Sequence, residues 1–144
     1  MEVDPAAFAR VPSNRLLGIT SVVHDDGGAT VVLAPRAELA QEYGVVHGGF
    51  LAALADTAAV YALLPKLKPG ERMTSIEFKV NFLAPADPNG GGLVAKAAIV
   101  KAGRTVRVVT VDVRQEVEAA ATGAAPRHVL TGLFTYAVLP EAGG

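Results

Sequence analysis

One apolar stretch, residues 44–65, constrains the fold more than any other part of the chain. Its sequence is GVVHGGFLAALADTAAVYALLP, and over 48–64 nearly every residue is apolar, with Ala and Leu the most frequent. Ala and Leu favour the helix, and a helix that is apolar on every side must be buried on every side. The stretch therefore predicts a central helix, about 25 Å long, that the rest of the chain surrounds.

Two features of this helix indicate chemistry. Asp56 lies in its middle, where a buried carboxylate is costly unless it is paired or has a function. His47, Gly48 and Gly49 lie at its expected start, where the first backbone N–H groups have no partner within the helix. Because the glycines lack side chains, these N–H groups predict a site for an anion or a developing oxyanion.

Composition limits the class of protein. The 144 residues are 51% hydrophobic and 19% charged, which predicts one soluble globular domain over 1–144, with an N-terminal segment 1–14 and a loose tail 140–144. Asp56 and Pro65 interrupt the apolar runs, so no membrane span is expected. A net charge of -1 and the lack of a basic helix face predict no nucleic-acid partner.

Residue types that are missing also limit the chemistry. The chain has no Cys, which excludes thiol nucleophiles and disulfides, and its three histidines are too scattered to propose a metal site. We therefore expect no metal. The first residues, MEVDPAAFARVPS, lack the pattern of a signal peptide, so the cytoplasm is the expected location.

The other segments predict an antiparallel sheet. Strands are expected at 16–24 and 29–33, separated by the hairpin turn Asp25-Asp26-Gly27-Gly28. After the helix, apolar and polar residues alternate over 76–82, and further strands are expected at 93–101, 105–116 and 129–139, with a flexible loop at 119–125. No second long helix can act as a parallel crossover. The class is therefore α+β, with a curved antiparallel sheet of five to six strands wrapped around one helix.

Four motifs in this order resemble the hotdog-fold acyl-CoA thioesterases, and among them the phenylacetyl-CoA thioesterase (PaaI-like) group. They are Gly44-x-x-His47-Gly48-Gly49, Asp56 nine residues after His47, VNFLAP at 80–85, and Lys101-Ala102-Gly103-Arg104. The resemblance covers about residues 16–139. It implies a hotdog fold, a homodimer that pairs sheets edge to edge and often pairs again into a homotetramer, and active sites across the dimer interface.

The resemblance also implies hydrolysis of an acyl-CoA, with aromatic or medium-chain acyl groups favoured and no cofactor, since coenzyme A is part of the substrate. Thioester hydrolysis needs a donor for the developing oxyanion and a base or nucleophile. Gly48 N–H and Asp56 suit these roles, and Asp56 either activates water or attacks the carbonyl. Eight residues separate them, about 12 Å along one helix, so two subunits are needed to bring both to one carbonyl.

Further site residues follow from the resemblance. His47 orients the loop, helps to bind the thioester carbonyl or only caps the helix, and Gln41 stands where the family usually has Asn. Ser75 matches a serine that holds the attacking water in some relatives, although strand alternation predicts that it faces outward with Glu77 and Lys79 unless the strand begins irregularly. The resemblance implies substrate-binding residues in three places. They are Lys101, Gly103 and Arg104 for the coenzyme A phosphates, Asn81 and Phe82 for the pantetheine channel, and Gly49 at the helix start.

Two other functions stay open on the same fold. A hotdog dehydratase would pair a histidine with an acid across the interface, but His47 lies inside the glycine motif and not in the proline-containing motif of the dehydratases. A non-catalytic acyl-CoA binder or sensor needs a separate partner, because the chain has no helix-turn-helix extension. Turnover of a thioester distinguishes the hydrolase from both.

Overall fold

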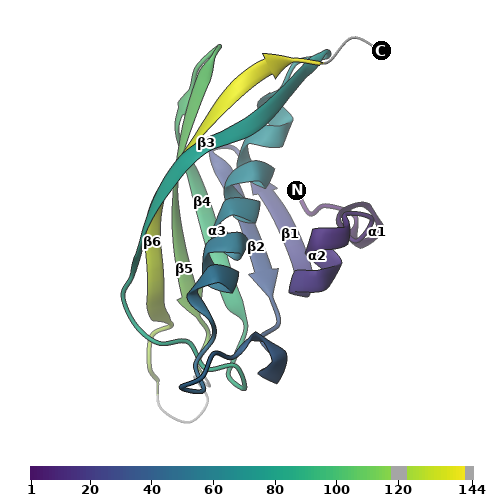
Figure 1. Ribbon diagram of the computed structural model, residues 1–144. Helices are drawn as coiled ribbons and strands as arrows, with labels where there is room; N and C mark the ends of the chain where they lie inside the picture. The colour runs from purple at the N-terminus through teal and green to yellow at the C-terminus, as the bar shows by residue number, and fades with distance from the viewer. Residues whose placement is uncertain (118–122, 142–144) are drawn as a thin grey trace.

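The computed structural model describes residues 1–117 and 123–141, in which a six-stranded antiparallel sheet curves around one long helix (Figure 1). Across the sheet the strands are ordered β1-β2-β4-β5-β6-β3. The elements are α1 (Pro5–Phe8), α2 (Pro12–Leu17), β1 (Ile19–Asp25), β2 (Gly28–Leu33), η1 (Ala37–Leu39), α3 (Gly48–Leu63), η2 (Leu64–Lys66), β3 (Glu71–Phe82), β4 (Leu93–Ala102), β5 (Val106–Gln115) and β6 (Arg127–Pro140). This confirms the predicted fold class.

The core lies between α3 and the sheet. Leu54, Ala55, Ala58 and Ala59 on the helix have no exposed surface. Alternate residues of the central strands face them, as period-two packing requires, and those of β5 are Val109, Val111 and Val113. Small alanines let the helix approach the sheet closely, so the apolar composition of α3 is explained by this packing.

Two sequence-based expectations about this part of the fold are wrong. Residues 12–17 form α2 and do not begin the first strand, because Pro12 suits the first turn of a helix and Gly18, at φ +85°, ends it. Gly48–Lys66 is also long and apolar enough to span a bilayer by length and composition alone. Asp56 and Pro65 therefore do not exclude a membrane span by these criteria, contrary to the expectation. The core helix of a globular fold passes the same test.

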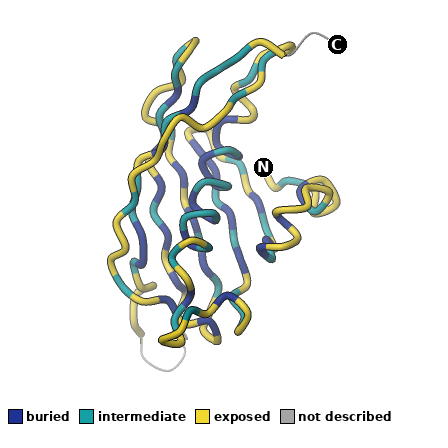
Figure 2. The backbone as a smooth tube through the Cα atoms, viewed as in Figure 1, coloured by how far each residue is buried: buried dark blue, intermediate teal, exposed yellow. Residues whose placement is uncertain are grey.

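The two edges of the sheet differ. The N-terminal residues lie along β1, where Glu2 bridges to Val23. The outer edge of β3 has no strand partner within residues 1–117 and 123–141, and most of this strand is exposed (Figure 2). Its apolar side chains remain open to solvent: Ile76 is 55%, Phe78 44% and Phe82 55% exposed. A long apolar edge of this kind favours pairing with another chain.

The predicted loop at 119–125 falls mostly on residues 118–122, which lie outside the described residues.

Candidate active site

Asp56 is half-buried on the side of α3 that faces β6. The hydroxyl of Tyr136 donates a short hydrogen bond to Asp56 Oδ1 and lies 3.3 Å from the Asp56 carbonyl oxygen. No Lys, Arg or His of the described chain lies within ion-pair distance of this carboxylate. It opens instead onto a cleft of about 450 Å³. The lining residues of this cleft, here called the Asp56 cleft, are Asp56, Val60, Leu64, Leu67, Glu71, Arg72, Met73, Thr74, Ser75 and Tyr136.

Ser75 lies in the Asp56 cleft, so the expectation that it faces outward is wrong. The register between β3 and β6 shifts between Ser75 and Glu77, which makes Ile76 an extra residue in the strand. Such a bulge reverses the alternation of side chains before it. Ser75 consequently pairs directly with Tyr136 and shares its helix-facing side, while Glu77 pairs with Thr135 on the other face.

At the start of α3, one of the two glycine N–H groups is already used. His47 Nδ1 accepts a hydrogen bond from Gly49 N–H at 2.9 Å, which confirms the capping role of His47 and occupies the Gly49 donor. Gly48 N–H has no hydrogen-bond partner among the described residues. The ring of Phe82 packs against Gly48 so closely that a Cβ there would lie 2.9 Å from its Cζ.

Gln41 reaches the same helix start from the preceding loop. Its side-chain oxygen accepts a hydrogen bond from Tyr43 N–H, and the turn closes at Gly44, whose φ of +78° favours glycine. A cleft of about 450 Å³ brings Gln41, Gly48 and Phe82 together.

The basic turn Lys101–Arg104 lies at the other end of α3. Arg107, which is only 4% exposed, donates hydrogen bonds to Gly103 O at 3.3 Å and to Lys66 O at 2.9 Å. These bonds hold the turn beside the end of the helix, while Lys101 and Arg104 stay exposed. Gly103 is required there, since a Cβ would lie 2.5 Å from Val106 O.

Asn81 is not brought to the site with its neighbour. Phe82 faces Gly48, so the preceding Asn81 points to the opposite face of the sheet, where it pairs with Thr131. Within this chain, Asn81 and Phe82 therefore face opposite sides of the sheet.

Sequence reasoning missed Tyr136 and Arg107. Alternation could have placed Phe134 and Tyr136 on the buried face of β6. Nothing local indicated that Tyr136 meets Asp56, because the two are 80 residues apart.

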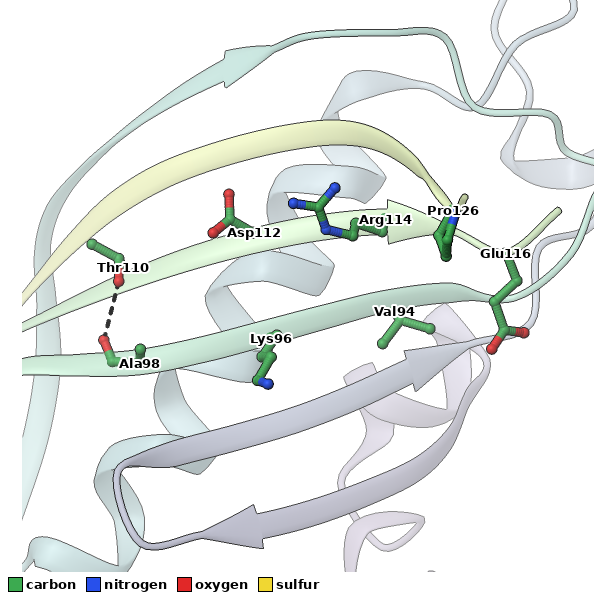
Figure 3. Close-up of a pocket in the computed structure, with 8 residues that line it drawn as sticks. All are labelled: Val94, Lys96, Ala98, Thr110, Asp112, Arg114, Glu116 and Pro126. Carbon is green, nitrogen blue, oxygen red and sulfur yellow. Dashed lines mark hydrogen bonds between the residues drawn. The ribbon is translucent and has the colours of Figure 1, made fainter. Parts of the chain in front are cut away.

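A third cleft, of about 410 Å³, lies on the face of the sheet away from α3 (Figure 3). It is lined by Val94, Lys96, Ala98, Thr110, Asp112, Arg114, Glu116 and Pro126. Asp112 bonds to His128 at 2.7 Å, but none of the predicted site residues lies here. No group of three potential metal-ligating side chains occurs within 1–117 and 123–141.

The architecture is that of the hotdog fold. The profile of the thioesterase superfamily matches residues 43–122, more than half of the chain and including all of α3, β3, β4 and β5. The protein therefore belongs to the thioesterase superfamily.

Curated relatives have related names. A presumed esterase of Halobacterium salinarum is 37% identical over 101 residues, 68% of this chain and 63% of that protein. A 1,4-dihydroxy-2-naphthoyl-CoA hydrolase of Listeria monocytogenes is 28% identical over 71% of this chain and 81% of that protein. The matched region spans only 54% of a presumed esterase of Haemophilus influenzae. The chain therefore matches only part of the length of this protein and of the Halobacterium protein.

Solved structures agree over nearly the whole chain. A thioesterase family protein from Silicibacter pomeroyi superposes with a TM-score of 0.81 at 28% identity, covering 94% of both chains. The PaaI protein from the phenylacetic acid degradation operon of E. coli has a TM-score of 0.77 at 24% identity, covering 96% of this chain and 90% of that one. The second similarity supports the fold alone.

Proposed function

We propose that the protein is an acyl-CoA thioesterase that works as a homodimer, with each active site built from two subunits. Membership of the thioesterase superfamily supports thioester chemistry, and the name of the Listeria relative supports a coenzyme A ester as substrate. The observation that carries the proposal is that, among the described residues, the Asp56 carboxylate has no cation partner and the Gly48 N–H has no acceptor.

The dimer is needed because these two groups are too far apart in one chain. Eight residues of helix separate them by about 12 Å, whereas a reacting carbonyl must lie about 3 Å from both. The exposed apolar edge of β3 supports pairing of two sheets around a two-fold axis. Two antiparallel helices would then bring Gly48 of each subunit toward Asp56 of the other.

In the proposed reaction, Asp56 acts as a general base. Asp56 and the hydroxyl of Ser75 hold a water molecule, and the carboxylate takes its proton as the oxygen attacks the thioester carbon. The carbonyl oxygen becomes negative and accepts a hydrogen bond from the Gly48 N–H of the other subunit. The C–S bond then breaks, and the thiolate of coenzyme A leaves and takes up a proton.

The substrate class follows from the walls of the site. The side chains of Val60, Leu64, Leu67 and Met73 give the Asp56 cleft an apolar wall, which suits an aromatic or medium-chain acyl group. Lys101 and Arg104, exposed at the turn beside the end of α3, would attract the phosphates of coenzyme A.

The test measures free thiol released from a panel of acyl-CoAs by the wild type, Asp56→Asn and Asp56→Ala. Asp112→Asn is the matched control, because it removes a hydrogen-bonded carboxylate from the opposite face of the sheet. We expect the turnover of both Asp56 variants to fall at least about 100-fold, which is the contribution typical of a general base. The control should keep its activity. Light scattering checks that all variants remain dimers or form the homotetramer.

Two outcomes would overturn the proposal. Unchanged turnover by Asp56→Ala removes the mechanism, and tight binding of acyl-CoA without turnover of any thioester favours the binder or sensor. A single-turnover reaction in ¹⁸O-water separates the two roles of Asp56. A general base puts ¹⁸O directly into the released acid, whereas a carboxylate nucleophile first transfers one of its own ¹⁶O atoms.

A further inference from the structure

The Asp56 carboxylate is held by one side chain from the far end of the chain. Tyr136, on β6, is only 2% exposed, and its hydroxyl donates a hydrogen bond to Asp56 Oδ1. The same hydroxyl lies 3.3 Å from the Asp56 carbonyl oxygen, so it contacts both the backbone and the side chain of this residue. Asp56 Oδ2 has no hydrogen-bond partner among the described residues and is left for a ligand.

We propose that Tyr136 is a positioning residue for the reaction, which orients the Asp56 carboxylate so that Oδ2 serves the attacking water beside Ser75. This rests on the proposed function of Asp56. A carboxylate on an alanine-rich helix can rotate about two side-chain bonds, and a fixed donor on one oxygen removes that freedom. The direct pairing of Ser75 with Tyr136 across the strands places the serine hydroxyl and the phenol on the same side of the sheet.

The phenol is suited to remain a donor. Burial, followed by the hydrogen bond to Asp56 and its charge, raises the pKa of Tyr136 above the ordinary value of 10.0. Tyr136 therefore keeps its proton at every pH at which the enzyme is assayed.

The test is Tyr136→Phe, which removes the hydroxyl and keeps the ring. Tyr61→Phe is the matched control, because Tyr61 is also a buried tyrosine with one hydrogen bond, from Asn14 at 2.9 Å, but lies away from the Asp56 cleft. We expect Tyr136→Phe to lower kcat about tenfold with little change in KM.

Two further measurements separate positioning from mere stability. In an Asp56→Asn background, Tyr136→Phe should cause no further loss, because Tyr136 acts through Asp56. Replacing Tyr136 by 3,5-difluorotyrosine keeps the shape and the hydroxyl donor, so kcat should stay within about threefold of the wild-type value. This second variant decides the question if Tyr136→Phe does not fold.

The inference is overturned if Tyr136→Phe keeps the wild-type kcat, if it raises KM as much as it lowers kcat, or if its effect adds to that of Asp56→Asn. A loss of kcat of about tenfold with difluorotyrosine overturns it as well. These failures leave the proposed function standing as long as Asp56→Asn alone is inactive. An active Asp56→Asn enzyme would instead remove the proposed function.

Discussion

Replacing Gly48 with proline tests the oxyanion donor directly. Gly48 is the first residue of α3 after the cap His47, a position where proline is favourable because its missing N–H has no partner within the helix. His47 has φ -60° and ψ 130°, an extended conformation that a following proline allows. Gly48→Pro therefore removes the proposed donor while the backbone of α3 stays in place.

The contact with Phe82 requires a matched control. A Cβ on residue 48 would lie 2.9 Å from Cζ and 3.0 Å from Cε1 of Phe82, so the ring must move. We therefore compare Gly48→Pro/Phe82→Ala with Gly48→Ala/Phe82→Ala, which differ in the backbone N–H and the proline ring. Loss of one oxyanion donor lowers kcat by about 100- to 1,000-fold, or about 3 to 4 kcal/mol. We expect the kcat of Gly48→Pro/Phe82→Ala to be at least about 100-fold below that of Gly48→Ala/Phe82→Ala.

Mixing inactive subunits tests the two-chain site. A dimer of one Asp56→Asn subunit and one Gly48→Pro/Phe82→Ala subunit has one site in which Gly48 and Asp56 are both intact. Random re-association of equal amounts makes about half of the dimers mixed, each with one of two sites working, so about one quarter of wild-type activity should return. Native mass spectrometry shows whether subunits have exchanged.

Two results would refute this reasoning. If Gly48→Pro/Phe82→Ala is as active as its alanine control, the backbone donor is not Gly48. If mixed dimers form and no activity returns, Gly48 and Asp56 do not act across the interface.

Three more predictions concern assembly and stability. Phe78→Lys puts a charge on the β3 edge and should give inactive monomers in sedimentation velocity, whereas the control Val100→Lys on β4 should keep the dimer. An active Phe78→Lys dimer would exclude this edge as the interface. Arg107→Gln should lower the free energy of unfolding by about 2–4 kcal/mol, because the guanidinium bonds to Lys66 O. Urea titration at one protein concentration measures this, and a decrease of less than about 0.5 kcal/mol would contradict it. Burial lowers the pKa of His24 below its ordinary value of 6.5, so the unfolded chain binds more protons and the free energy of unfolding should fall as the pH drops below about 6.5. His24→Gln should flatten this pH dependence, and an equal slope in both proteins would argue against the role of His24.

The sequence alone determined the parts of the fold that depend on near neighbours. The apolar run over 48–64 predicted the central helix within a residue of its observed end, and alternation predicted a strand over 76–82 within β3. Asp56 and Gly48 could be chosen because one is a carboxylate within an apolar helix and the other lies at its start. The helix rise alone separates them by about 12 Å, and the proposed second subunit rests on that distance.

The tertiary structure decided what depends on the register between distant segments. The bulge between Ser75 and Glu77 turns Ser75 toward the helix, and no local pattern of residues in β3 marks it, since it appears only when β3 pairs with β6. The bond from Tyr136 to Asp56 joins residues 80 positions apart for the same reason. Propensity and alternation act over a few residues, whereas the contacts that orient the Asp56 carboxylate exist only after the sheet has closed around its helix.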